Sequence, residues 1–481
     1  MRKGLFVLLT AVLAVAIAMP AMADLIPTNV KISGFYRSKA WLSNFHDGGG
    51  GPSLRVAEEE QSNSFVEQRA RIKFAFGSEN VQAVWQFESD MLWGDTSGAL
   101  GRNQGGAAGA DSIQLETKNV YVWFKVPDTS VNVSVGLQGI GDSYAGLLFS
   151  GGAFDAAGIV VKGKLEPVTY RVAWAKMYGD IPNDTHQSND TDLYIAEAKF
   201  APTKTAQVGA NFYFLKDGSG KLAANGTTDS GPKLDPFNGG GPIANAKLNL
   251  FIPGVTLNLK TGPASISAFA FYQFGTLEST VGAPDVDVRA YGVDVRGDLK
   301  AGPGNVFIEG IYLSGGDDPN AKYEAPITMG DFQAAGVATG PGGMSGFSRT
   351  RMWILLPTWD LINVSQCLIG CSGGEYGDSL GNGGRGIWHV AAGYTQKVTE
   401  KTKIEANVGY LSATKLYAVG DEFRDKDFGT EVNAGLHYNI MKGLDAGLFG
   451  AYVFLGDFVK DDATTTFVDP WSTYARLNYS F

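Results

Sequence analysis

The sequence predicts an all-β fold, a transmembrane antiparallel β-barrel of about 18 strands. Three observations support it: apolar and polar residues alternate along many short segments, short and long connections alternate between those segments, and no apolar run beyond the leader is long enough for a membrane helix. Glycine makes up 64 of the 481 residues and aromatic residues 12%. Many strands joined by turns accommodate both enrichments, whereas a disordered chain contains few aromatic residues.

The alternation is clearest in the segments 64–76 and 471–481. In 64–76, apolar residues such as Ile72 and Phe74 alternate with Arg69, Arg71 and Lys73. The last segment, WSTYARLNYSF, repeats the pattern and ends on an aromatic residue. Because side chains of a strand point alternately to its two faces, each segment has one apolar and one polar face.

The first 23 residues read as a secretory signal peptide. A basic start is followed by an apolar run and by a small-residue cleavage site, Ala21-Met22-Ala23. Cleavage there leaves residues 24–481, which we expect to form a single barrel. Loss of Arg2 and Lys3 changes the formal net charge from −10 to −12, and this acidity argues against nucleic acid as a partner.

The connections alternate between short and long. The sequence predicts eight short turns, at 77–80, 127–130, 164–167, 201–205, 260–263, 301–304, 398–402 and 441–444. Nine long polar segments separate them, at 44–62, 94–112, 139–155, 180–190, 217–245, 278–285, 315–385, 416–426 and 457–470. Eight hairpins plus one strand at each end give 18 strands. Short periplasmic turns and long extracellular loops are the layout of an outer-membrane barrel.

Three segments fit this plan less well. In 117–126 and 285–300 the polar face switches, which suggests a bulge. The apolar segment 351–363 is assigned to the long extracellular loop 315–385, because one further spanning strand would make the number odd. Sixteen strands remains an alternative.

The terminal segment resembles the C-terminal targeting strand of bacterial outer-membrane barrels, which ends in Phe. The whole pattern resembles a bacterial porin, as an architecture rather than as a sequence motif. This resemblance implies a water-filled channel in the outer membrane of a Gram-negative cell, for passive diffusion of small hydrophilic solutes and ions. It also implies a homotrimer without a cofactor. We further expect contact with outer-membrane lipid and, through acidic outer loops, with lipopolysaccharide, and no metal site, because the four histidines have no metal-ligand spacing.

In porins the third long loop folds into the lumen opposite a row of basic residues. Here that loop is 139–155, which contains Asp142 and Asp155 and is apolar enough to fold inward, although the PEFGG motif of classical porins is absent. The predicted inward positions near the barrel seam are basic. The hypothesis is a transverse field across the pore, whose selectivity sign stays open, and its pore-lining residues are Arg37, Arg69, Arg71, Lys73, Arg476, Asp142 and Asp155.

Other functions are tested against the same sequence. Cys367 and Cys371 are candidates for a local disulfide. The alternative to a pore is a barrel that acts as a conduit or sheath for a periplasmic electron-transfer protein. The segment 377–380, GDSL, matches an esterase signature, but no histidine follows an aspartate at the spacing which that family needs. We therefore expect no enzymatic activity.

Overall fold

The computed structural model describes residues 29–46, 62–96, 105–109, 113–152, 154–178, 190–222, 246–279, 282, 284–318, 321–328, 347, 349–356, 367–369, 381–417, 425–460 and 467–481. The predicted signal peptide, 1–23, lies outside these residues and stays a prediction, as does the domain span 24–481. Within the described part of the chain, no helix is long and apolar enough to cross a membrane.

The fold consists almost entirely of strands. They are β1 (Asn29–Ser43), β2 (Asn63–Gly77), β3 (Val81–Leu92), β4 (Glu116–Lys125), β5 (Asn132–Gly139), β6 (Asp155–Leu165), β7 (Val168–Tyr178), β8 (Thr191–Thr203), β9 (Ala206–Leu222), β10 (Ala246–Thr261), β11 (Ala264–Ser279), β12 (Val286–Ala301), β13 (Gly304–Leu313), β14 (Lys322–Tyr323), β15 (Ile387–Lys397), β16 (Thr402–Ala413), β17 (Asp427–Met441), β18 (Leu444–Leu455) and β19 (Trp471–Ser480). In the part of the chain that the structure describes, two short helices lie in connections, η1 (Asn382–Gly384) and α2 (Asp457–Lys460).

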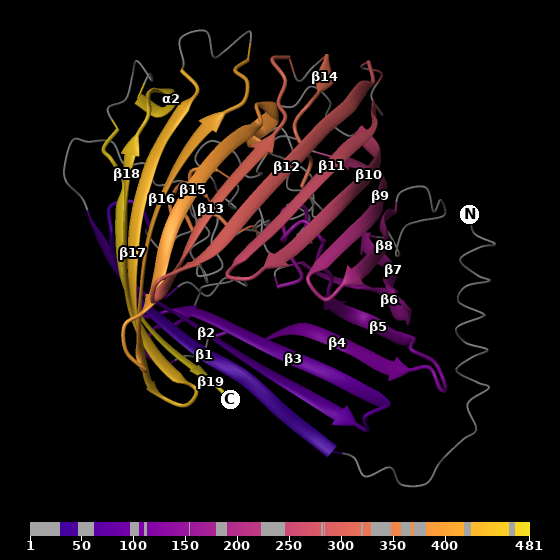
Figure 1. Ribbon diagram of the computed structural model, residues 1–481, viewed down its shortest axis with the longest axis horizontal. Coiled ribbons are helices and arrows are strands. Elements are labelled where there is room, and N and C mark those ends of the chain that lie inside the picture. Colours follow the sequence, from indigo (N-terminus) through magenta and orange to yellow (C-terminus); the bar gives the residue numbers. More distant parts are fainter. Residues whose placement is uncertain are drawn as a thin grey trace.

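The strands form one closed sheet. Each long strand pairs antiparallel with its neighbours in the chain, and β1 pairs with both β2 and β19, so no edge remains unpaired (Figure 1). Because β14 has only two residues and lies in the long connection between β13 and β15, eighteen of the nineteen strands span the barrel. The prediction of 18 strands is confirmed, and the alternative of 16 is wrong. Lipid offers no hydrogen-bond partner to a free strand edge, which is why the sheet closes.

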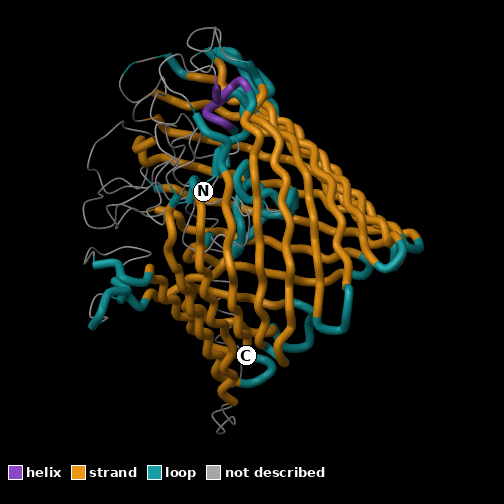
Figure 2. The backbone as a smooth tube through the Cα atoms, turned by 90° about the vertical axis from the view of Figure 1, so that its left-hand side faces the viewer, coloured by secondary structure: helices purple, strands orange, loops and turns teal. Residues whose placement is uncertain are grey.

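All eight predicted short turns are present, and all lie at one end of the barrel. For example, β2 ends at Gly77 and β3 begins at Val81, while β17 ends at Met441 and β18 begins at Leu444. The long connections lie at the other end, where Figure 2 shows α2 far from the C-terminus. In an outer-membrane barrel the short turns face the periplasm and the long loops face the exterior.

The two faces of the sheet differ as the alternation predicts. Large apolar side chains on the outer face are exposed, among them Ile72 of β2 and Val295 of β12. On the inner face of the same strands, Arg69 and Asp294 are buried. Directly opposed residues on neighbouring antiparallel strands share a face. The registers therefore identify which residues of each strand face the lumen of the barrel.

The two strands with a switched polar face have different explanations. A register shift at Gln86/Phe87, where β3 pairs with β4, fits the bulge predicted near residue 117. Strand β12 keeps an unbroken register with both β11 and β13, so the bulge predicted in 285–300 is wrong. Near its extracellular end, Asp287 and Arg289 point outward and are exposed, while Val286 and Val288 are buried inside. The polarity reverses because the interior there is filled with protein rather than water.

Candidate functional site: the barrel lumen

The basic residues predicted to line the pore do meet at the seam where the barrel closes. Arg37 of β1 lies opposite Arg69 of β2 on one side and Asn478 of β19 on the other, and its guanidinium Nε donates to Asn478 Oδ1 at 3.2 Å. Arg476 of β19 lies two residues away on the same face. Closure of the sheet thus brings together residues from opposite ends of the chain.

These arginines are paired with carboxylates that the sequence interpretation did not single out. Arg69 forms a bidentate pair with Asp90 of β3, with N–O distances of 2.6 and 2.5 Å. Arg71 pairs with Glu88, which also lies 3.6 Å from Arg69. Such forked pairs fix both groups in orientation. The wall therefore presents alternating, fixed charges rather than a uniformly positive surface.

Arg476 and Lys73 differ in their surroundings. The Arg476 guanidinium lies 3.2 Å from Asp445 of β18 and packs over the ring of Phe449. Lys73 lies opposite Ser33 and Gln86, and no carboxylate among the described residues pairs with it. Lys73 is thus the member of the predicted set whose charge remains uncompensated.

A first inner segment, residues 140–152, folds into the lumen. It is part of the loop predicted to do so, and Asp142 holds it together. The Asp142 carboxylate accepts four backbone N–H groups, from Tyr144, Gly146, Leu148 and Phe149, at 2.7 to 2.8 Å. Burial raises the pKa of this carboxyl to about 6, against the opposing effect of the four donors. The Asp142 carboxylate therefore stabilises the backbone conformation of its own loop.

The first inner segment is anchored to the wall at polar and apolar contacts. The Tyr213 hydroxyl of β9 accepts from the Ser143 N–H at 2.9 Å and donates to Glu197 of β8 at 2.7 Å. The Tyr144 ring packs against Phe269 and Phe271 of β11. Since a Cβ at Gly254 would collide with the Tyr144 hydroxyl, a glycine at that position of β10 leaves room for the segment.

Asp155 lies where this loop rejoins the wall. As the first residue of β6, it accepts from Lys118 Nζ at 2.6 Å and from Asn119 Nδ2 at 2.7 Å. Both predicted acidic groups of the loop thus have protein partners: backbone amides for Asp142 and a lysine for Asp155.

A second inner segment, residues 349–356, comes from the long connection between β13 and β15. The Glu431 carboxylate of β17 accepts the backbone N–H groups of Trp353, Ile354 and Leu355 at 2.7 to 2.9 Å. The Trp353 ring packs against Phe449 at a centroid distance of 5.6 Å. This apolar part of the predicted loop 315–385 therefore lies inside the barrel.

Two arginines attach the second inner segment to further strands. Arg349 lies 3.0 Å from Asp294 of β12 and 3.5 Å from Glu309 of β13. Arg351 donates to Thr395 Oγ1 at 2.8 Å. Sequence reasoning missed Arg349 and its partners. The signal in the sequence that could have indicated this contact is Glu309, an acidic residue in an otherwise apolar stretch of strand β13.

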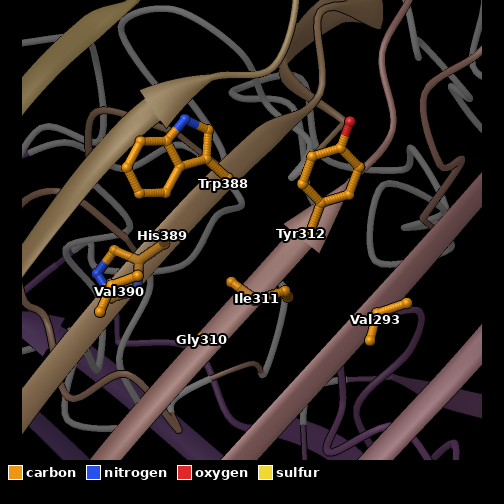
Figure 3. A pocket seen from close by; sticks show the side chains of 7 residues that line it. All are labelled: Val293, Gly310, Ile311, Tyr312, Trp388, His389 and Val390. Atoms are coloured by element: carbon orange, nitrogen blue, oxygen red, sulfur yellow. The ribbon is translucent and has the colours of Figure 1, made fainter.

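The outer wall carries a shallow apolar groove across β12, β13 and β15 (Figure 3). It lies above Gly310, and the side chains of Val293, Tyr312, Trp388 and Val390 border it. These side chains are on the lipid-facing side of the sheet, whereas His389 lies on the lumen side opposite Ile311 and Leu411. The groove is therefore part of the membrane-facing surface and not of the pore.

Two predicted features lie partly or wholly outside the described residues. Cys367 is buried, but Cys371 is outside them, so the disulfide stays a prediction. The segment 377–380 is also outside them. Within the described residues, no three His, Cys, Asp or Glu side chains are grouped as metal ligands.

Comparison with known proteins agrees with this architecture. A family model described as "Porin subfamily" matches residues 266–475. No curated protein matches the chain.

Among solved structures, the outer membrane protein OpdK of Pseudomonas aeruginosa is similar at 10% identity and a TM-score of 0.50, over 94% of this chain and 98% of that one. OccK8 (OprE) of P. aeruginosa and OccAB2 of Acinetobacter baumannii match at 10% identity and TM-scores of 0.52, with the same coverage of 94% and 98%. At such identities these structures support the fold, and the family model supports the channel. The conduit alternative is not favoured. The chain thus has the β-barrel fold of bacterial outer-membrane porins and matches the porin subfamily over residues 266–475, which supports a channel for diffusion of small solutes across the Gram-negative outer membrane.

Proposed function

We propose that solutes pass between the two inner segments and the lumen face of β1, β2, β3 and β19, and that this face orients them. We call this face the arginine wall, because it carries Arg37, Arg69, Arg71 and Arg476. The observation that carries the proposal is the fixed pairing of Arg69 and Arg71 with Glu88 and Asp90 on the lumen face, where the Arg71 side chain is the most accessible of the four. Fixed charges of both signs at the same depth along the barrel axis favour solutes that have a dipole moment or that carry both a positive and a negative charge. Fully charged guanidinium groups hold this pattern at any working pH.

The proposal predicts opposite effects of two matched double variants. Arg69→Ala with Arg71→Ala leaves two carboxylates uncompensated, so the reversal potential in a salt gradient should shift toward cation selectivity. Glu88→Gln with Asp90→Asn should shift it toward anion selectivity. Planar-bilayer recording measures both. If neither pair of substitutions changes the reversal potential while the channels conduct, the arginine wall does not line the solute path.

The solute class is best approached with small aromatic acids. The OpdK structure with vanillate, whose barrel matches this one at 10% identity and a TM-score of 0.51, makes vanillate a suitable first probe. Uptake of labelled vanillate into liposomes containing the porin tests it, with a neutral phenol of similar size as the control. Equal uptake of both compounds would contradict selection of the acid.

We infer that the protein has no catalytic activity. The closest resemblance to a catalytic pair within the described residues is His46, whose Nδ1 lies 2.8 Å from Ser472 Oγ. Both residues are buried, so this arrangement has no surface for a substrate. Incubation of the purified barrel with phospholipid tests the inference, and steady release of fatty acid would overturn it.

The homotrimer implied by the porin resemblance is a further proposal, as is binding of lipopolysaccharide. The mass of the detergent-solubilised protein, corrected for bound detergent, tests the first. A mass of three chains supports it, and a mass of one chain contradicts it. Lipopolysaccharide that remains bound through purification would support the second.

A further inference from the structure

Lysines gather on the lumen face at the periplasmic end of the barrel. Each lies within about four residues of the short-turn end of its strand, and together they span the part of the wall from β1 to β12, twelve of the eighteen spanning strands. This group, the periplasmic lysine collar, consists of Lys31, Lys73, Lys125, Lys162, Lys199, Lys260 and Lys300. For instance, Lys260 is the penultimate residue of β10 and Lys300 the penultimate residue of β12.

The registers place these lysines inside. Lys73 lies opposite Gln86, and Lys162 lies opposite Arg171, whose side chain reaches the first inner segment. The chain neighbours Ile72 and Leu299 point outward and are exposed to lipid. Since neighbouring residues of a strand alternate between faces, the lysines next to them face the lumen.

The collar differs from the rest of the lumen because its charges are not matched. In the described part of the chain, none of the seven lysines lies within 4 Å of a carboxylate. By contrast, the lumen-facing lysines nearer the exterior are paired, Lys39 with Glu67 at 3.9 Å and Lys118 with Asp155 at 2.6 Å. The mid-height arginines are paired as well. Among the described residues, the lumen-facing lysines without a carboxylate partner are therefore concentrated at one end.

We propose that the periplasmic lysine collar concentrates small anions at the inner mouth and makes the pore electrically asymmetric. The inference rests on the proposed function, because it requires an open channel. The reach of uncompensated charges grows as salt falls, from about 8 Å at 0.15 M to about 30 Å at 0.01 M. Anion preference is consequently greatest when the dilute solution bathes the periplasmic mouth.

The test is a pair of opposite potassium chloride gradients across the same bilayer. A tag in the connection 223–245 identifies which side of the bilayer the extracellular end of the porin faces. The anion-to-cation permeability ratio should be at least about twofold higher when the dilute side is periplasmic, where screening is weakest. The triple variant Lys73→Gln, Lys162→Gln, Lys199→Gln should reduce this difference by more than half. The control triple variant Lys247→Gln, Lys426→Gln, Lys460→Gln removes the same charge at the extracellular end and should preserve it.

Three results would overturn the collar: equal ratios in the two gradients, a collar variant that behaves as the wild type, or a control variant that loses the difference equally. If the triple variant does not fold, the single variants Lys73→Gln and Lys162→Gln serve instead, each with a smaller loss expected. A protein that folds but never conducts would instead contradict the proposed function. That outcome is distinct from a conducting pore without asymmetry.

Discussion

The two inner segments reach the same lumen but are held in opposite ways. In the first, residues 140–152, the carboxylate that organises the backbone belongs to the segment itself, since Asp142 accepts four of its amides. In the second, residues 349–356, the organising carboxylate is Glu431 on the barrel wall. Buried backbone amides need acceptors in both cases. The sources of those acceptors differ.

The difference indicates how each segment responds to change. The first segment depends on one side chain for its internal shape. The second has several separate anchors, because Arg349 and Arg351 also reach Asp294 and Glu405. Both segments also contact the wall, so the comparison concerns the acceptor of the backbone amides: loss of Asp142 should disturb the backbone of the first segment more than loss of Glu431 disturbs the second.

The largest effect is expected from Asp142→Ala. It leaves four buried amides without acceptors, each of which costs about 1–3 kcal/mol, so the inward fold of the first segment should be lost. Single-channel recording should show a higher and noisier open conductance. The strands themselves should remain, as far-ultraviolet circular dichroism would report.

The matched control for that prediction is Asp155→Ala at the end of the same loop. Asp155 binds wall groups, Lys118 and Asn119, and no amide of the segment. Its conductance should stay close to the wild-type value. Equal noise in the two variants would show that Asp142 has no special part in shaping the segment.

A smaller effect is expected from Glu431→Gln. Glutamine keeps one carbonyl oxygen but offers an N–H group where the carboxylate had an acceptor, so about one or two of the three amide bonds should be lost. Brief openings to a larger conductance should increase without a permanent change. Glu88→Gln is the control, because Glu88 contacts wall arginines instead of this segment. A permanent increase in conductance for Glu431→Gln would mean that the remaining anchors are too weak to hold the second inner segment in the lumen.

The smallest effect is the pH dependence of the first segment. Burial raises the pKa of Asp142 from 3.8 to about 6, so the folded loop binds a proton more readily than the unfolded loop does. Its stability is therefore greatest below the unfolded pKa and falls as the pH rises toward 6, with no further change above that. Conductance noise should be lower at pH 4.5 than at pH 7. The Asp142→Asn variant, which does not titrate, should lose this difference.

The alternation of residues in the sequence predicted most of the fold. Segments such as 64–76 show their lumen and lipid faces directly, because the two-residue period follows from strand geometry alone. The eight short turns were also predicted correctly, because a turn, like the alternation in a strand, depends on residues that are close together in the sequence. The bulge predicted in 285–300 failed because the reversal in β12 comes from protein packed inside the barrel, which the local pattern does not contain.

The candidate site was predicted only in part. The sequence indicated Arg69 and Arg71 as inward residues, and it indicated that 139–155 folds inward. It did not indicate that Glu88 and Asp90 pair with those arginines, or that Glu431 holds residues 353–355. These contacts depend on register and on which loop enters the lumen.

By itself, the sequence determined that this chain forms a closed barrel with a wet interior, since each strand records its two environments in its own residues. Only the tertiary structure decided where charge remains uncompensated inside. Arg37 and Asn478 are 441 positions apart in the chain and meet because the sheet closes. Coulomb energies depend on such distances in space, and a one-dimensional pattern does not contain them.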